Sequence, residues 1–128
     1  MWPPVVERVA EVFRAAGAEA RLEELPEGEE WPGQGVRAEA FDCAGRLVVA
    51  LVPAERSADA RKLGCPSARV VPLPPFPFRR ASVYLERSLL ATSTVWIEAG
   101  TSHHVVGVSP SQLLQLVRAQ TGDFVADD

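Results

Sequence analysis

The stretch VRAEAFDCAGRLVVALV, residues 36–52, decides the fold class of this chain. It predicts two strands, 36–43 and 46–52, joined by the two-residue turn Ala44-Gly45. The second strand is apolar on both faces, which is typical of a strand at the centre of a sheet. We therefore expect residues 48, 50 and 52 on one buried face and residues 47, 49 and 51 on the other.

Outward from this hairpin, the pattern predicts helices on either side and further short strands. The predicted helices run from Pro3-Pro4 to Gly17, from a Ser57 cap to Gly64, and from the Ser109-Pro110 cap to about Thr121. The predicted strands are 21–25, 68–71, 82–86, 94–98, 103–108 and 124–125, and residues 26–35 are a loop. The expected fold class is α/β (α+β), a mixed, mostly antiparallel sheet flanked by helices, in one domain over residues 1–128.

Composition and charge limit the possible functions. Hydrophobic residues make up 47% and charged residues 23%, the balance of an ordinary globular protein. A net charge of −4 argues against broad, sequence-independent binding of nucleic acid, but not against a small contact with one RNA end.

No apolar run has the roughly 20 residues of a membrane span, and the N-terminus has no leader pattern. We expect a cytoplasmic protein without a membrane partner. The absence of asparagine and the single lysine, Lys62, favour a heat-adapted source or a GC-rich genome.

The cysteines and histidines give no pattern of a metal site. Cys43 and Cys65 lack the close pairing of a structural zinc site, so we expect two reduced, metal-free thiols. His103 and His104 follow a glycine turn at the start of a strand, where consecutive side chains face opposite ways. No motif for a cofactor is present, since Gly33-Gln34-Gly35 lacks the lysine of a phosphate-binding loop. We expect neither a cofactor nor a metal.

The run PLPPFPF, residues 72–78, has four prolines in seven positions and must be extended. Three interpretations remain open: a rigid surface connection, a polyproline ligand for a partner domain, or the wall of a pocket. Phe76 and Phe78 are too apolar to be left fully in water, which favours inward packing.

Several segments taken together resemble a known family. The main one is TVWIEAGTSH at 94–103, followed by SPSQLL at 109–114; the others are ELPEG at 24–28, LVVALVP at 47–53, KL at 62–63, PPF at 74–76 and LERSLL at 85–90. In this order they resemble the YbaK-like aminoacyl-tRNA deacylases, the prolyl-tRNA synthetase-associated editing domains. Helices usual between Gly28 and Gly33, and between Val71 and Pro74, are absent. The chain resembles a shortened, divergent member.

The resemblance implies a trans-editing hydrolase. Such an enzyme removes a wrong small amino acid, such as alanine or cysteine, from tRNA for proline without a metal. The implied partners are the tRNA acceptor end and, as a further candidate, an aminoacyl-tRNA synthetase. The implied catalytic residues are Arg37, at the position of the family's lysine, and His103 of the turn. The implied substrate-binding residues are Val71, Pro72, Phe76, Phe78, Gly100 and Ser102.

Two departures from the family pattern leave the activity open. Arg37 keeps the lysine's charge but cannot deprotonate. Val71-Pro72 replaces a Gly-Gly pair whose backbone amides shape the site, and Pro72 has no N–H to donate. The alternatives are therefore a deacylase with a remodelled site, an inactive relative that binds a tRNA end, a nucleotide or a protein partner, and an unrelated function on a shared fold.

Overall fold

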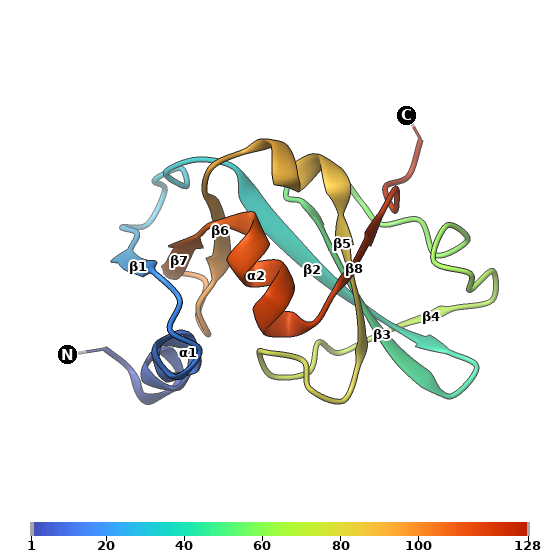
Figure 1. Ribbon diagram of the computed structural model, residues 1–128, viewed down its shortest axis with the longest axis horizontal. Coiled ribbons are helices and arrows are strands. Elements are labelled where there is room, and N and C mark those ends of the chain that lie inside the picture. The colour runs from blue at the N-terminus through green and yellow to red at the C-terminus, as the bar shows by residue number, and fades with distance from the viewer. Residues whose placement is uncertain (1, 128) are drawn as a thin grey trace.

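The computed structural model describes residues 2–127, which form one eight-stranded sheet with two α-helices against it (Figure 1). The helices are α1 (Pro4–Ala15), the 3₁₀ helix η1 (Arg87–Ala91) and α2 (Pro110–Val117). The strands are β1 (Ala20–Glu24), β2 (Gly35–Cys43), β3 (Arg46–Pro53), β4 (Arg69–Val71), β5 (Ser82–Glu86), β6 (Val95–Glu98), β7 (His104–Val108) and β8 (Gln120–Gly122).

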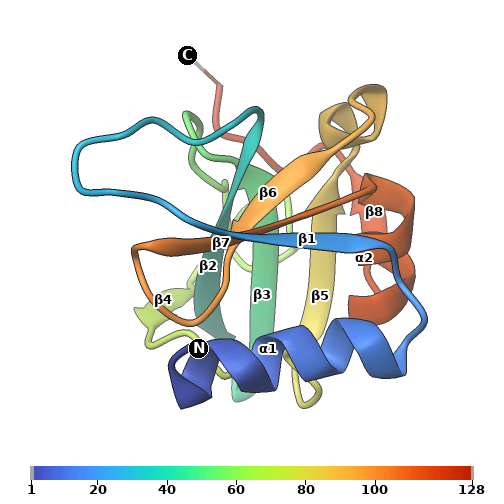
Figure 2. The same ribbon diagram turned by 90° about the vertical axis from the view of Figure 1, so that its left-hand side faces the viewer.

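The sheet is mixed and mostly antiparallel, as the sequence predicts. Its order is β1-β7-β6-β2-β3-β5-β8, and β4 pairs with β2 beside this path. β1/β7, β7/β6, β2/β3 and β2/β4 are antiparallel, while β2/β6, β3/β5 and β5/β8 are parallel. Figure 2 shows β1 and β7 running crosswise to β2, β3 and β5, so the sheet is strongly bent.

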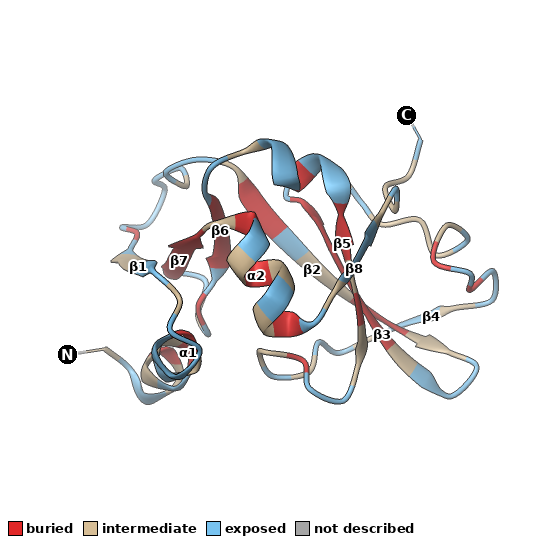
Figure 3. Ribbon diagram, in the orientation of Figure 1, coloured by how far each residue is buried: buried red, intermediate tan, exposed pale blue. Residues whose placement is uncertain are grey.

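The central hairpin is confirmed. Ala44-Gly45 joins β2 and β3, with Cys43 opposite Arg46, and residues 48–52 are 0% exposed. Val49 and Leu51 enter the main core, whereas Val48 and Ala50 pack on the other face. Figure 3 shows this burial continuing along β5 and β7. Both faces of β3 are therefore covered.

Both α-helices pack on the face of the sheet that carries Val49. α1 begins at Pro4 and buries Val6, Val9 and Phe13, which recur at helical spacing. α2 begins as predicted, with the Ser109 hydroxyl accepting a hydrogen bond from the Gln112 N–H at 3.2 Å. The two helices together close the main core.

Two predictions about helices are wrong. Residues 57–64 form turns, because the C-terminal tail takes their backbone groups: Ala58 bridges to Val125, and the Asp59 N–H donates to the Phe124 carbonyl at 2.8 Å. α2 stops at Val117, since Arg118 adopts a left-handed conformation, φ 56°, and the chain continues as β8. Of the predicted strand 124–125, only the bridge at Val125 forms.

The prediction of two reduced cysteines is also wrong. Cys43 and Cys65 are joined by a disulfide, with their Cα atoms 5.6 Å apart across 22 residues. β4 pairs with β2 so that Arg69 lies opposite Asp42, and this brings the preceding loop against the end of β2. The bridge therefore ties the hairpin to the segment that leads into the proline-rich run.

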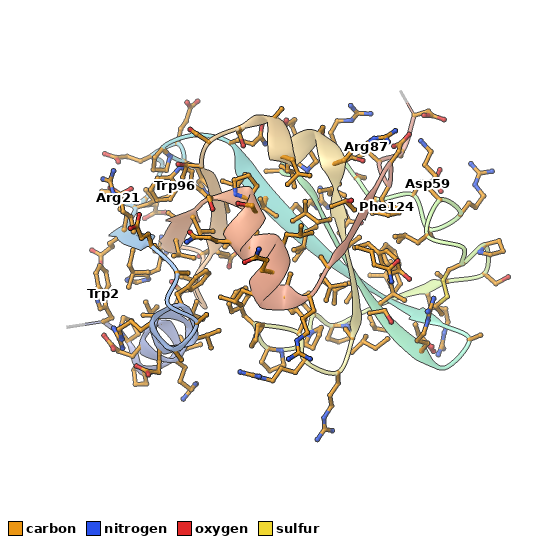
Figure 4. The ribbon with its side chains drawn as sticks, in the orientation of Figure 1. Trp2, Arg21, Asp59, Arg87, Trp96 and Phe124 are labelled. Carbon is orange, nitrogen blue, oxygen red and sulfur yellow. A yellow bond between two sulfur atoms is a disulfide. The ribbon has the colours of Figure 1, made fainter. Side chains whose placement is uncertain are left out.

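Trp96 lies flat on a glycine of the neighbouring strand. It stands opposite Gly107 in the β6/β7 ladder, and a Cβ on Gly107 would lie 2.7 Å from the ring. Trp96, which Figure 4 labels, is 6% exposed, and it packs with Leu25 and Val105. Gly107 is therefore required for close approach rather than for its backbone angles.

Gly107→Ala should lower the free energy of unfolding by about 1–3 kcal/mol, because the added methyl group overpacks the ring. Urea denaturation measures this loss. The double variant Gly107→Ala/Trp96→Phe should recover part of the difference, since the smaller ring leaves room. A Gly107→Ala midpoint equal to that of the wild type would contradict the packing described.

Glu86 is a buried carboxylate, 4% exposed, that holds the tail to β5. It accepts hydrogen bonds from the Phe124 N–H at 2.8 Å and the Ser88 N–H at 3.0 Å. Burial alone would raise the pKa of Glu86, but these hydrogen bonds outweigh it and the pKa lies below its ordinary 4.5. The ionised form is therefore the stabilising one.

Glu86→Gln should cost about 1–3 kcal/mol of stability at neutral pH, because an amide cannot accept both hydrogen bonds. The carboxylate's contribution is complete above the unfolded-state pKa and disappears as the pH falls through the lower folded-state pKa. The wild type should therefore lose stability below pH 4.5, and the variant should lose less. Urea unfolding across this range measures both. Parallel pH profiles of the two proteins would be inconsistent with this role.

Candidate functional site

A pocket of about 950 Å³ opens where the sheet is interrupted. It lies between the end of β6 and the loop after β4, and α1 forms one wall. β6 pairs with β2 only at residues 35–36, and β4 pairs only at residues 40–42. Residues 37–39 of β2 lie between these two pairings, and residues 36–38 line the pocket. Its size is at the upper end of the usual range for small-molecule sites, roughly 300–1,000 Å³.

The proline-rich run forms another wall. Residues 73–79 line the pocket. Phe76 stacks on Phe13 of α1 with ring centroids 5.1 Å apart, and Phe78 meets Phe76 edge-on at 5.4 Å. Phe78 is 3% exposed and Phe76 is half-buried. Of the three interpretations, the structure therefore supports the pocket wall.

Arg37 lies at the rim. Its Nε is 3.0 Å from Glu39 Oε1, on the same face of β2, and its side chain is 53% exposed. Glu39 is held in turn by the Ala58 N–H at 3.4 Å. The carboxylate fixes one side of the guanidinium and leaves its other donors open to solvent.

Further charges surround the opening, and the interior is apolar. The other charged lining residues are Arg8, Glu11, Arg79 and Glu98. Together with Arg37 they give three arginines and two glutamates, and Glu39 beside the lining balances the charge of Arg37. Such a site can bind a small apolar group inside and an anion at its edge.

The structure brings together some of the predicted site residues and not others. Arg37, Phe76, Phe78 and Gly100 line the pocket. Gly100 has φ 93°, and a Cβ there would lie 2.9 Å from Val5, so this turn closes against α1. The predicted residues outside the lining are Val71, Pro72, Ser102 and His103.

His103 is exposed, and within residues 2–127 its hydrogen bonds are made by its own backbone groups. Its N–H donates to Thr101 Oγ1 at 3.2 Å, and its carbonyl accepts from the Leu25 N–H at 2.7 Å. The buried histidine is His104, 6% exposed, with Nδ1 2.6 Å from Thr101 Oγ1 and Nε2 3.3 Å from Glu24 Oε2. The expectation that His103 and Arg37 share one concave patch is not met by this pocket.

Sequence reasoning missed the contribution of α1 and of the loop 26–34. Val5 and Val12 line the pocket beside the buried stripe of α1, which consists of Val6, Val9 and Phe13. Apolar side chains beside such a stripe were the available signal. Trp31 lines the pocket from the loop and covers Gly35, where a Cβ would lie 2.8 Å from its ring. Nothing local in the sequence places Trp31 there.

The residues that could hold a metal do not gather. Within residues 2–127, no group of three or more histidine, cysteine, aspartate or glutamate side chains has the geometry of a metal site. Over the same residues, no helix has both the length and the apolarity needed to cross a membrane.

Comparisons with known proteins find similarity in structure alone. No protein-family model matches the sequence, and no curated protein matches it. The crystal structure of a putative trans-editing enzyme for prolyl tRNA synthetase matches with a TM-score of 0.81 at 23% identity, over 99% of this chain and 100% of that one. A chain from work on epitope backbone grafting onto scaffold proteins matches with a TM-score of 0.83 at 22% identity, over 99% and 100%. The hypothetical protein APE2540 matches at 0.75 and 18%, over 93% and 99%.

These likenesses concern the fold. They support the resemblance to the YbaK-like editing domains at the level of chain topology, over nearly the full length of the chain. The chain therefore has the mixed α/β fold of a protein described as a putative trans-editing enzyme for prolyl tRNA synthetase.

Proposed function

We propose that this protein hydrolyses misacylated aminoacyl-tRNA in trans, releasing a small amino acid such as alanine or cysteine from tRNA for proline. The observation that carries this proposal is the apolar pocket with arginines at its mouth, on a fold shared with a putative trans-editing enzyme. The proposed location is the cytoplasm. The proposed partners are the tRNA acceptor end and an aminoacyl-tRNA synthetase that releases the wrong product.

The pocket has apolar walls and charged side chains at its mouth, and this arrangement suits an aminoacyl ester. Its apolar walls, including Val9 and Phe76, exclude water from the amino-acid side chain. Arg8, Arg37 and Arg79 offer charged donors to the phosphates of the acceptor end. This local contact needs no positive net charge on the whole chain.

Arg37 acts in this proposal as a fixed donor and not as a proton carrier, because a guanidinium stays protonated. It binds a phosphate or the ester carbonyl, and His103 contacts the tRNA end outside the pocket. Phe76 and Phe78 limit the size of the amino acid. Gly100 and Ser102, with Val71 and Pro72, border the path of the acceptor strand.

A second candidate is a relative that binds the tRNA end, a nucleotide or a protein partner without catalysis. Two observations favour it: Pro72 lacks the N–H that a Gly-Gly loop would supply, and arginine replaces the family's lysine. The two candidates differ in hydrolysis and not in binding.

Incubation with a panel of misacylated tRNAs separates these candidates. We expect alanyl- or cysteinyl-tRNA for proline to lose its amino acid faster than in buffer, and correctly charged prolyl-tRNA to stay intact. Binding with no acceleration for any member of the panel would favour the second candidate. Neither binding nor hydrolysis would reject both.

A further inference from the structure

The edge of β2 that faces the pocket has a gap in its strand pairing. β6 pairs with Gly35 and Val36, and β4 pairs with residues 40–42. Residues 37–39 have no strand partner on this edge, whereas the opposite edge pairs with β3 throughout. The gap opens into the pocket, since residues 36–38 line it.

Within this gap, the backbone of Ala38 points toward the pocket. In an antiparallel pair, alternate residues turn both N–H and C=O toward the partner strand. The Gly35 carbonyl accepts from the Ala54 N–H at 2.9 Å, so the odd-numbered residues of β2 face β3. Ala38 therefore faces the other way. In the described part of the chain, neither its N–H nor its C=O has a hydrogen-bond partner.

An unpaired donor and acceptor on one residue form a specific binding element. Ala38 is half-buried, so its two groups are reached through the pocket and are only partly solvated. Buried backbone groups are nearly always paired, and the cost of leaving them unpaired is recovered when a ligand supplies the partners.

We propose that the N–H and C=O of Ala38 bind the aminoacyl group itself, supplying the backbone donor that Pro72 lacks. An aminoacyl ester carries an α-ammonium group and a carbonyl oxygen in the same arrangement as the N–H and C=O of one strand residue. It exchanges two hydrogen bonds with Ala38 as an antiparallel strand residue does. This inference rests on the proposed function.

The chemistry of this contact is that of an oxyanion site. Water adds to the ester carbonyl carbon, and the carbonyl electron pair moves onto the oxygen that the Ala38 N–H holds. Collapse of this intermediate breaks the bond to the ribose oxygen, which takes one proton from the attacking water. The products are the free amino acid, ionised by loss of the second proton, and tRNA with its terminal hydroxyl restored.

The same geometry directs the side chain of the amino acid. Paired residues of two antiparallel strands place their side chains on the same face. The side chain of Ala38 lies with Val36 and Ala40 on the face of the main core, where Val9 and Phe76 wall the pocket. An L-amino acid bound to Ala38 therefore turns its side chain toward these apolar walls.

Amide hydrogen exchange tests the structural premise without any substrate. The Ala38 amide should exchange rapidly in the free protein, while those of Val36 and Ala40, which are paired on either side of it, should be protected. Saturation with a non-hydrolysable alanyl-sulfamoyl adenosine should then protect Ala38 and shift its amide proton downfield.

Two variants test the role in hydrolysis. Ala38→Pro removes the N–H at a position where it takes no part in the ladder, as proline requires in a strand. Loss of one oxyanion donor should lower kcat by about 10²- to 10³-fold with little change in KM. Ala38→Ser keeps the N–H and is the matched control, so the difference in kcat between the two variants measures the loss of the N–H apart from the change of side chain.

The outcomes separate this inference from the proposed function. If the wild type hydrolyses misacylated tRNA but Ala38→Pro matches Ala38→Ser, Ala38 is not the donor and the function stands. If the wild type hydrolyses nothing but the analogue still protects Ala38, the binding role stands and the function fails. If Ala38→Pro does not fold, the exchange experiment decides. A slowly exchanging Ala38 amide in the free protein, or one that the analogue leaves unchanged, overturns the inference.

Discussion

Replacing Arg37 by alanine should weaken binding of aminoacyl-tRNA by about ten- to a hundredfold, because it removes a charged hydrogen bond worth roughly 1.5–3 kcal/mol. Hydrolysis of misacylated tRNA should fall with it to the uncatalysed rate. The fold should be unaffected, since the side chain is 53% exposed and its one described partner is Glu39. Filter binding and release of labelled amino acid measure the two effects.

Two further substitutions control for the charge of Arg37 and for its ion pair with Glu39. Arg37→Lys keeps the charge and introduces the lysine of the editing domains that the sequence resembles, so it should preserve or raise the rate if the proposed hydrolysis uses that lysine chemistry. Glu39→Gln releases the guanidinium from its ion pair and leaves Arg37 in place, so binding should persist. Full activity in Arg37→Ala would remove Arg37 from the site.

Opening the disulfide should lower the free energy of unfolding by about 3 kcal/mol, because the bridge Cys43–Cys65 closes a loop of 22 residues in the unfolded chain. The double variant Cys43→Ala/Cys65→Ala should show this loss in urea denaturation. The bridge also anchors the segment before β4, so the variant should expose residues 66–79 to protease earlier than the rest of the chain.

Reduction of the wild type gives the matched control. The reduced protein keeps both side chains, and Cys65 is 4% exposed, so any gap between reduced wild type and the alanine variant reports packing and not the bridge. Rapid alkylation of both thiols without a reductant, together with an unfolding midpoint that a reductant does not move, would refute the bridge.

Local patterns in the sequence predict the sheet centre well. The apolar run at residues 47–52 predicts a central strand that is covered on both faces, because successive side chains of a strand face opposite ways. The Ser109-Pro110 start of α2 is likewise a local signal, satisfied within one turn. Such features need no knowledge of the rest of the chain.

Long-range pairing accounts for what the sequence missed. Residues 57–64 carry the sequence signals of a helix start and a helix end, yet the C-terminal tail pairs with Ala58 and the segment forms turns instead. The two cysteines meet because β4 pairs with β2. The sequence shows no such pairing, and the expected reducing compartment predicts free thiols. Trp31 and Val12 likewise line the pocket because the loop 26–34 and α1 pack beside it, and this packing is not visible in the local sequence.

We propose above that the pocket under α1 binds the aminoacyl end of tRNA. The most direct test of this proposal is the rate at which the wild type and Val12→Trp release alanine from alanyl-tRNA for proline. Val12 is half-buried and lines the pocket, so an indole there should obstruct the part of the cavity beside α1 with little cost to the core. The wild type should release alanine rapidly and the variant at close to the uncatalysed rate, with equal unfolding midpoints. Equal rates for the two proteins would contradict this proposal.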